Sequence, residues 1–371
     1  MTVPPSAAVD VSLVETPIGC VDLQRVRANA RRVAAYAAEH DLGWRPHIKT
    51  HKSRTVAKIQ LEAGARGLTV ATLREAEVMA GLTDDLLLAY PPVGAAKLDR
   101  LMALPPHLDL KVGLDSPEVL DALAAAARGA GRTVGVLVEQ DVGLGRVGLQ
   151  TAAGVVALAD RARGLEGVRY RGIMFYPGHV RSASDTEQDL ALRNVTRSLR
   201  RTLKALRDAG LDPEIVSGGS TPTLWRSHEL KGVTEIRSGS CIYNDREGLD
   251  LHVATLEDLA YTVLTTVVST AVPGHAVIDA GSKALAKEAR GASGYGIVLE
   301  HPDVIVSALS EEHGVLDLGG STWRPRIGER VRIVPNHVCV SVNLQDRMLA
   351  RDGEAHHHLL VEGRGRGPWR G

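Results

Sequence analysis

The sequence contains few cysteines and very few aromatic residues. Its three cysteines, Cys20, Cys241 and Cys339, are odd in number and far apart in the chain. This usage argues against a disulfide framework and fits a reducing compartment. Aromatic residues make up only 3% of the 371 residues, with a single Phe. The scarcity argues against the aromatic stacking surface with which proteins bind single-stranded nucleic acids.

Net charge and long apolar segments are absent as well. The 44 Lys and Arg residues balance the 44 Asp and Glu residues, so no overall field attracts nucleic acid or an anionic membrane. No apolar run reaches the roughly 18 residues of a membrane-spanning helix, and the first fifteen residues do not resemble a signal peptide. We therefore expect a cytoplasmic protein with a small-molecule partner, and neither a nucleic-acid nor a membrane partner.

Short apolar, β-branched runs alternate with longer stretches of helical period from about residue 18 to residue 240. This pattern predicts repeated βα units and a parallel sheet. The predicted strands are 18–23, 43–49, 67–71, 85–90, 108–113, 133–139, 170–176, 214–217 and 233–237. Because a G-x-G-x-x-G turn after the first strand and a P-loop are both missing, we expect a closed (β/α)₈ TIM barrel.

The pattern changes after about residue 251, where short alternating strands are separated by Gly, Pro and Asp turns. The segments HAVIDAG (275–281) and ERVRIVPNHVCVSVNLQD (329–346) are examples. We expect two domains in this α/β protein. Residues 16–251 would form the barrel, and residues 252–371, with residues 1–15, would form a C-terminal antiparallel β domain.

Reactive side chains follow several predicted barrel strands, at the ends where βα loops converge. Lys49 ends the second strand, where burial and neighbouring positive charge would lower the pKa of its amine and make it nucleophilic. The alternative is a surface lysine in a polar K-T-H-K loop. Arg146 follows a later strand and suits an anionic ring oxygen of a cofactor. The alternative for Arg146 is an ion pair with Glu139 or Asp141.

Two glycine-rich segments, SGGSTPT and IRSGS, end the last two predicted strands. Their glycines let the backbone approach a ligand closely, and their hydroxyls lie where a helix begins. These features predict a phosphate site, with an ordinary helix cap as the alternative. The residues concerned are Gly218, Gly219, Ser220, Thr221, Gly239 and Ser240.

The predicted β domain contains one candidate metal site. His337 and Cys339 are two residues apart on a strand-like run, so their side chains would share one face of the strand. An imidazole and a thiolate together favour zinc, and two protein ligands leave coordination positions open for a substrate. A buried, inert cysteine beside a hydrogen-bonded histidine is the alternative.

These motifs together resemble the fold-type III pyridoxal-phosphate (PLP) enzymes, specifically the D-threonine aldolase and D-serine dehydratase group. The resemblance covers nearly the whole chain. It rests chiefly on RPHIKTHK (45–52), DVGLGRVG (141–148), SGGSTPT (217–223), EIRSGS (235–240) and PNHVCVSVNLQD (335–346).

The resemblance implies a role for each candidate residue. Lys49 would form the Schiff base with PLP, Arg146 would approach the ring oxygen, and Tyr176 would lie near the ring. The six Gly, Ser and Thr residues named above would bind the phosphate. His337 and Cys339 would hold a divalent ion, zinc first, with manganese or magnesium as alternatives. The family also implies a homodimer in which the β domain closes over a barrel mouth.

The resemblance implies a D-3-hydroxy-amino acid as substrate and leaves two reactions open. The H-x-C pair favours a D-serine dehydratase-like β-elimination, since the best-known aldolases have H-x-D. His179, in YPGHVRS, matches a histidine of the aldolases, which cleave such substrates to glycine and an aldehyde. Either His179 or Lys49 would transfer the proton.

Three other functions remain as alternatives. An amino-acid racemase on the same barrel is one, although it has no need of the metal. A cofactor-carrying protein without catalysis is another, but it would have no use for residues 252–371. The third is a cofactor-free metal hydrolase that uses His47, His51 and a carboxylate at the barrel mouth.

Overall fold

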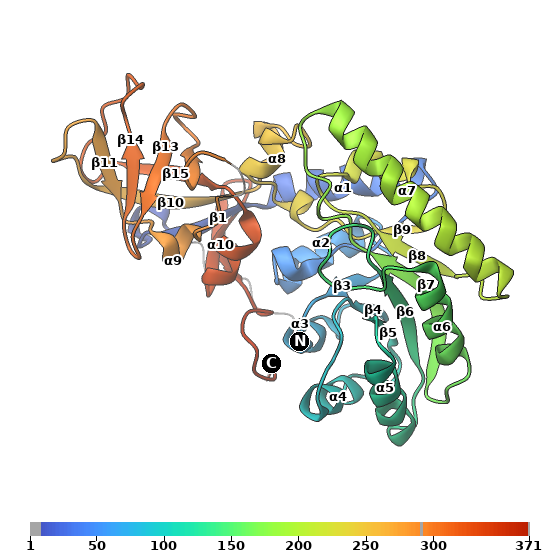
Figure 1. The fold of residues 1–371 in the computed structure, drawn as a ribbon. Coiled ribbons are helices and arrows are strands. Elements are labelled where there is room, and N and C mark those ends of the chain that lie inside the picture. Colours follow the sequence, from blue (N-terminus) through green and yellow to red (C-terminus); the bar gives the residue numbers. More distant parts are fainter. Residues whose placement is uncertain (1–8, 290–291, 370–371) are drawn as a thin grey trace. The chain divides into compact units, whose positions relative to one another are not determined.

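The computed structural model describes residues 9–289 and 292–369, which form two compact units (Figure 1). The barrel unit comprises residues 31–49, 57–239 and 363–371, and the β unit comprises residues 1–30, 50–56 and 240–362. The division at residue 251 stays a prediction, and residues 1–8, 290–291 and 370–371 lie outside the described residues. Within those residues, every helix is too short or too polar to cross a membrane.

Eight parallel strands form the sheet of the barrel unit, in the order β2-β9-β8-β7-β6-β5-β4-β3. A parallel bridge between His47 and Thr69 joins the β2 segment to β3 and closes the ring. This arrangement confirms the (β/α)₈ barrel. The strands are β2 (Gly43–Trp44), β3 (Leu68–Val70), β4 (Asp85–Leu88), β5 (Asp109–Leu114), β6 (Val134–Gln140), β7 (Val168–Phe175), β8 (Ile215–Gly218) and β9 (Glu235–Ile236).

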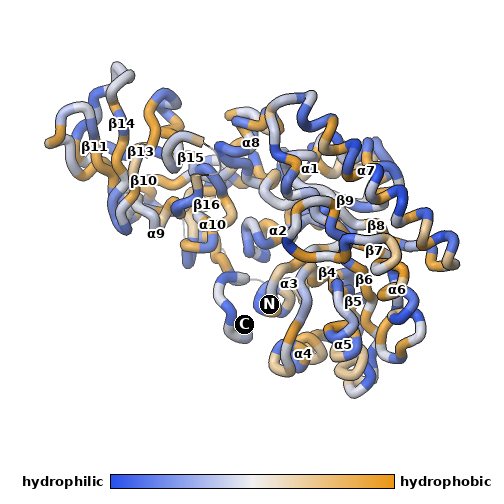
Figure 2. The backbone as a smooth tube through the Cα atoms, viewed as in Figure 1, coloured by the Kyte–Doolittle hydropathy of each residue, from blue (hydrophilic) through white to orange (hydrophobic). Residues whose placement is uncertain are grey.

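Burial and helix caps explain why these segments form a barrel. All seven residues of β6 are buried, as expected for a parallel strand covered on both faces, and Figure 2 shows apolar residues along the barrel strands. Thr72 and Ser116 cap the helices after β3 and β5, each accepting a backbone N–H. The helices are α1 (Leu23–Glu39), α2 (Arg54–Glu62), α3 (Leu73–Met79), α4 (Ala95–Met102), α5 (Pro117–Gly129), α6 (Ala152–Arg163) and α7 (Asp185–Asp208).

A nine-stranded sheet forms the β unit, in the order β11-β14-β13-β12-β15-β10-β1-β16-β17, and β11 also pairs with β10. Its first strand corrects one prediction. The run 18–23 was expected in the barrel, but β1 pairs with β10 and β16 in this sheet. The strands are β1 (Ile18–Asp22), β10 (Tyr261–Ser269), β11 (His275–Ile278), β12 (Gly296–Val298), β13 (Ile305–Leu309), β14 (Gly314–Asp317), β15 (Arg330–Pro335), β16 (Arg347–Asp352) and β17 (Ala355–Leu360).

Short helices connect the strands. The α-helices of the β unit are α8 (Arg246–Asp250), α9 (Ser282–Leu285) and α10 (Val338–Leu344). The 3₁₀ helices are η1 (Val11–Leu13), η2 (Ile48–Thr50), η3 (Leu224–Glu229), η4 (Ser240–Ile242) and η5 (Leu256–Asp258). Two of them, η2 and η4, contain predicted site residues.

A buried ion-pair network lies near the amino-terminal ends of the barrel strands. The Arg45 side chain is 2% exposed, and its Nε lies 3.0 Å from Glu235, which is fully buried. Arg45 also binds both oxygens of Asp85, which in turn accepts from Lys111. The amino-terminal face of a (β/α)₈ barrel serves stability, whereas the opposite face carries the active site. We therefore assign this network a structural role.

Replacement of Arg45 tests that role. We expect Arg45→Met to lower the free energy of unfolding by about 3 kcal/mol, because it leaves the Glu235 charge buried without its main partner. Arg66→Met is the matched control, since Arg66 is half-exposed and lies 3.7 Å from the same Glu235. The control should lose about 1 kcal/mol or less. Urea unfolding measures both, and equal losses would contradict the assignment.

Candidate active site

Lys49 lies in a 3₁₀ turn and not at the end of a strand as predicted. β2 ends at Trp44, and η2 carries Lys49. Pro46 lacks the N–H that would continue the strand. The Lys49 Nζ lies 5.8 Å from the centroid of the Tyr176 ring, and the Arg146 Cζ lies 5.1 Å from the same centroid. The barrel unit thus brings these three predicted residues together around one aromatic ring, at cation–π distances.

Hydrogen bonds to Asp141 hold the loop that carries Arg146. The Asp141 carboxylate accepts from the backbone N–H groups of Gly143, Leu144 and Gly145. Arg146 itself is exposed and forms no ion pair with the described residues. The alternative of an ion pair with Glu139 or Asp141 is therefore not observed, and the guanidinium is available to a ligand.

The glycine-rich ends of β8 and β9 lie side by side, since the Arg237 N–H donates to the Gly218 carbonyl. Gly219 has a φ of 94°, in the left-handed region. The three atoms nearest to a Cβ built on Gly219 are side-chain atoms of Ser227 and Ile236, at 3.5–3.8 Å, which is ordinary van der Waals distance. The left-handed φ, and not a steric clash, therefore favours glycine at this turn.

The other residues predicted to bind phosphate are placed as follows. Ser220 is buried and its hydroxyl lies 3.0 Å from that of Thr223, which precedes η3. Thr221 is half-buried and Gly239 is buried, both in the barrel unit. Ser240 is half-buried and begins η4 in the β unit.

Three polar side chains that follow β2 and β9 in the chain contain buried atoms. Nδ1 of His47, Nη1 of Arg237 and Oγ of Ser238 form no hydrogen bond with the described residues. Such atoms are costly in a protein interior unless a ligand or water pairs with them. These residues fit an anionic cofactor. We did not predict Arg237 or Ser238 as site residues, although both lie in the EIRSGS motif.

Burial sets the protonation of two further groups there. Burial, with the nearby charges of Lys49 and Arg237, holds the pKa of His47 well below its ordinary value, so its ring is neutral at pH 7. Burial also raises the pKa of Glu139, although Arg237 and Arg146 act in the opposite direction. Glu139 therefore lies near Arg237 and Arg146, and the sequence suggested it only as an ion-pair partner of Arg146.

His179 is exposed and lies against the loop of Arg146. A Cβ built on Gly143 would be 3.0 Å from the His179 Nε2. His51, proposed for the hydrolase alternative, accepts the Ser53 N–H at its Nδ1. Neither His47 nor His51 belongs to a group of three metal-binding side chains among the described residues. This geometry does not favour the hydrolase.

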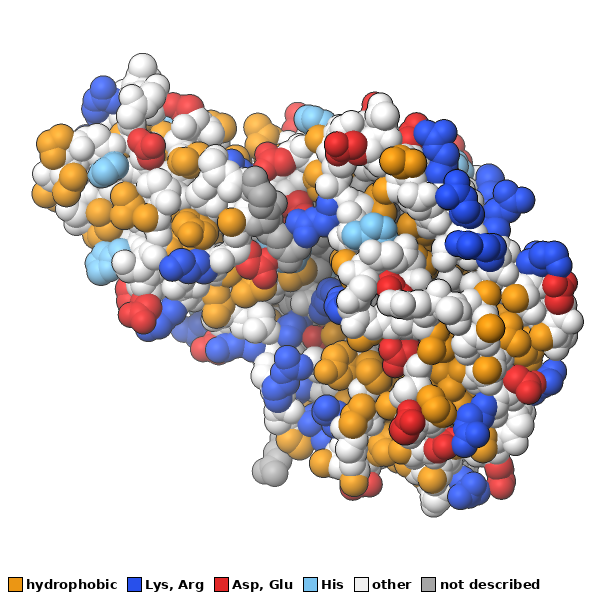
Figure 3. Space-filling model, viewed as in Figure 1, with side chains coloured by type: hydrophobic (Ala, Val, Ile, Leu, Met, Phe, Trp, Pro, Cys, Tyr) orange, Lys and Arg blue, Asp and Glu red, His pale blue; other side chains and the backbone are white. Residues whose placement is uncertain are grey.

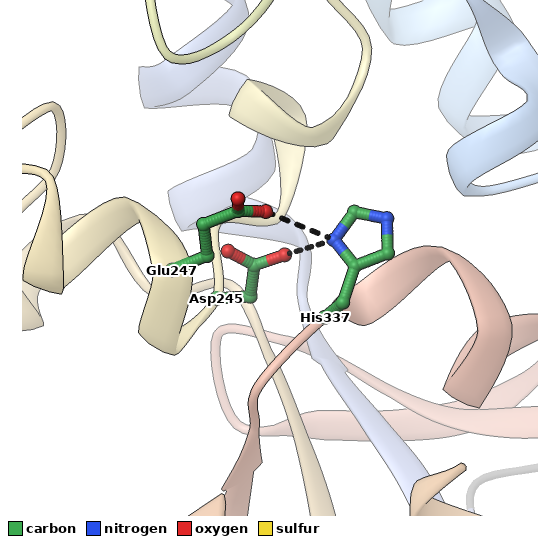
Figure 4. Close-up of side chains that lie close together, drawn as sticks. All are labelled: Asp245, Glu247 and His337. Carbon is green, nitrogen blue, oxygen red and sulfur yellow. Dashed lines mark hydrogen bonds and ion pairs between the residues drawn. The ribbon is translucent and has the colours of Figure 1, made fainter. Parts of the chain in front are cut away.

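The metal-site candidates lie at the start of a helix, which corrects the predicted strand. His337 is the N-cap of α10, and Cys339 lies in its first turn. Oxygens of Asp245 and Glu247 lie 3.0 Å and 3.6 Å from the His337 Nδ1 (Figure 4). Asp245, Glu247 and His337 form a group that could hold a metal ion, and we did not predict the two carboxylates.

Asp245 has several hydrogen-bond donors around its carboxylate. The Asp245 carboxylate accepts backbone N–H groups from Gly248 and Val338 in addition to its contact with His337. Burial lowers the pKa of His337, but Cys339 and Asp245 raise it to about 10. The Cys339 Sγ lies 3.2 Å from the Thr50 hydroxyl. Imidazole, thiol and carboxylate form a donor set that fits zinc.

Two family models match this chain. The family model "Alanine racemase, N-terminal domain" matches residues 21–247, and a serine dehydratase domain matches residues 260–350. The chain belongs to the alanine racemase-like, fold-type III PLP enzymes. This confirms the resemblance inferred from the sequence motifs.

Relatives cover nearly the full length of this PLP enzyme. A D-threonine aldolase from Arthrobacter sp. is 32% identical, over 98% of this chain and 96% of the relative. The crystal structure of D-threonine aldolase from Filomicrobium marinum has a TM-score of 0.90 at 28% identity, covering 98% and 99% of the two chains.

A second solved relative is a dehydratase. It is a cysteine-to-alanine mutant of a D-threo-3-hydroxyaspartate dehydratase, described as being in the metal-free form. Its TM-score is 0.84 at 30% identity, covering 96% of this chain and 98% of the other. The named relatives identify this family member as a PLP-dependent lyase.

Proposed function

We propose that this lyase acts on D-3-hydroxy-amino acids and eliminates the β-hydroxyl, giving a 2-oxo acid and ammonia. The observation that carries this proposal is the Cys339 thiol beside His337, whose Nδ1 faces the carboxylates of Asp245 and Glu247. The cysteine-to-alanine mutant of a dehydratase relative, described as metal-free, supports a role for such a thiol. Retro-aldol cleavage to glycine and an aldehyde is the second candidate, because a D-threonine aldolase is 32% identical to this chain and a D-threo-3-hydroxyaspartate dehydratase is 33% identical.

The barrel unit would hold PLP. When bound, PLP supplies an electron sink for negative charge at the substrate Cα. Lys49 would attach it, Arg146 would contact the ring oxygen, and Tyr176 would limit movement of the ring. The residues predicted to bind phosphate would do so through backbone N–H groups and hydroxyls. Arg237 would add a charged donor, since its Nη1 has no partner among the described residues.

Proton transfer at Cα falls to Lys49 or His179. Lys49 and Arg146 lie near the same Tyr176 ring, and an amine in its uncharged form accepts a proton. His179 is exposed and would exchange protons with water. We propose Lys49 as the base, with His179 acting on the side-chain hydroxyl.

His337 and Cys339 would ligate a divalent metal, preferentially zinc and otherwise manganese or magnesium. Asp245 would be a positioning residue, because its oxygens already accept two backbone N–H groups and it faces the His337 Nδ1. This contact leaves the His337 Nε2 for the metal. Zinc, when bound, supplies Lewis acidity toward the substrate hydroxyl.

Product analysis tests the proposed reaction. We expect the holoenzyme with zinc to release 2-oxo acid and ammonia from D-serine and D-threonine. Glycine and acetaldehyde from D-threonine would instead assign the aldolase reaction. Inversion of alanine that persists with a chelator would assign a racemase. We also propose a homodimer, on the family resemblance, and sedimentation equilibrium measures that mass.

The phosphate site is tested by adding one methyl group. Gly219→Ala should weaken PLP binding by at least about tenfold, which is about 1.4 kcal/mol, because a side chain disfavours the left-handed φ and would shift the backbone N–H groups proposed to bind the phosphate. Gly210→Ala is the matched control, since Gly210 also has a positive φ, of 66°, and a Cβ there meets nothing within 4 Å. Both variants should lose about 1–2 kcal/mol of stability from the strained backbone.

Titration of each apoprotein with PLP, followed by absorbance, measures the affinity, and thermal unfolding measures the shared cost. Equal PLP affinity of the two variants would remove Gly219 from the phosphate site.

A further inference from the structure

The outer face of α7 carries a row of positive side chains. Arg193, Arg197, Arg200, Arg201 and Lys204 are all exposed, and they follow one another mainly at steps of three and four residues. Such steps place side chains on one face of a helix, and the row spans about 16 Å at the α-helical rise. Figure 3 shows Lys and Arg side chains gathered over this part of the barrel unit.

This row forms one wall of a groove with a volume of about 730 Å³. Arg226, Asp189 and Glu229 complete the charged lining, and Leu192 and Thr196 add its uncharged part. Six lining residues are positive and two are negative, so the lining has a formal charge of +4. The volume is in the range of small-molecule sites.

The two carboxylates of the groove are already paired. Arg226 Nη2 lies 2.6 Å from Asp189 and 2.8 Å from Glu229. Arg193 lies 3.7 Å from the other oxygen of Asp189. At the other end of the row, Lys204 Nζ lies 2.6 Å from Asp208. Acidic groups therefore neutralise Arg226 and both ends of the row, but not its middle.

Three guanidinium groups in the middle of the row have no carboxylate partner among the described residues. Arg197 donates to the side-chain oxygen of Asn194, which is uncharged. Arg200 and Arg201 form no ion pair within the described part of the chain. Their positive charges are thus available to an anion from solution.

Helix stability does not explain this arrangement. Like charges three and four residues apart on a helix repel each other and destabilise it. The helix dipole favours cations only in the last turn, where α7 has Arg207. Arg197, Arg200 and Arg201 lie before that turn, so their mutual repulsion is unfavourable for the helix unless an anion binds.

We propose that the α7 groove binds a small polyphosphate, either inorganic or as part of a nucleotide. Arg197, Arg200 and Arg201 lie within about 6 Å along the helix axis. Each guanidinium can bind phosphate oxygens through two parallel N–H groups, and linked phosphates present charge at similarly close intervals. The lining contains no aromatic side chain, which disfavours a single-stranded nucleic acid. The site is separate from the PLP residues and does not depend on the proposed function.

Calorimetric titration of the holoenzyme tests the proposal, because PLP then fills its own phosphate site. The probes are inorganic triphosphate and ATP, each at low and high salt. We expect binding that weakens with salt. The triple variant Arg197→Gln/Arg200→Gln/Arg201→Gln should bind at least about tenfold more weakly. The matched triple change to Lys should lose less affinity than the Gln triple variant, because it keeps the three charges but not the paired N–H groups.

Each outcome decides the matter. Tighter binding of ATP than of triphosphate identifies a nucleotide as the ligand, and equal binding identifies inorganic polyphosphate. No binding at low salt, or equal binding by wild type and the Gln triple variant, overturns the proposal. Binding of an oligonucleotide without binding of triphosphate also overturns it. The changed positions are exposed, and Gln has a helix propensity similar to that of Arg, so the triple variant should fold. The single variant Arg200→Gln provides a second measurement of the loss of affinity.

Discussion

Lys49→Ala should reduce the rate of product formation from D-serine or D-threonine by about 10⁴-fold. The variant removes the amine that would attach PLP and accept the substrate proton, so two steps lose the same group. Tyr176 and Arg146 remain in place, and PLP should still bind through its phosphate and ring contacts. The measurements are the steady-state rate and the visible absorbance spectrum before and after borohydride reduction, with peptide mapping of the reduced lysine in the wild type.

Lys58→Ala is the matched control for this prediction. Lys58 is exposed on α2 and lies 3.7 Å from Glu62, a surface pair that contributes little to stability. The control should keep the wild-type rate and spectrum. If borohydride labels a lysine other than Lys49, or if Lys49→Ala keeps more than a tenth of the activity, the cofactor attachment that we propose is wrong.

Cys339→Ala should lower both metal content and lyase activity, each by at least about 100-fold. The thiolate is the ligand that makes this cluster suited to zinc. Its loss leaves His337 as the one remaining proposed protein ligand. A chelator should inactivate the wild type in the same way, and added zinc should restore the wild type but not the variant. Metal analysis after dialysis and rate measurements with each metal test these expectations.

Cys20→Ala is the matched control for the thiol. Burial raises the pKa of Cys20 to about 11, so at pH 8 its thiol remains protonated and is a poor metal ligand. The control should retain its metal and its activity. Full activity of Cys339→Ala in the presence of chelator would show that this lyase needs no metal.

The barrel was predictable because its strands are buried on both faces. Runs such as Val134–Gln140 read as continuous apolar segments between helices with recognisable caps. The position of β1 was not predictable in the same way. A short segment of five residues, IGCVD, fits either sheet, and its pairing with β10 and β16 depends on residues more than 200 positions away.

The metal cluster shows a second limit. The alternating pattern of VCVSV predicts a strand, yet α10 forms there because its helical spacing buries Val338, Ser341 and Val342 together. Asp245 and Glu247 gave no signal of their own, since carboxylates in a polar segment are usually solvated. Only the fold places Asp245 against His337.

The position of β1 has a consequence for synthesis of the chain on the ribosome. Every strand of the barrel sheet lies between residues 43 and 236, so that sheet can form while translation continues. β1 must wait for β16, whose first residue is Arg347, before its parallel edge is covered. At about 5–20 residues per second, that delay is on the order of 15–65 seconds. During this interval the nascent chain exposes an unpaired strand edge, which is where chaperones are expected to bind.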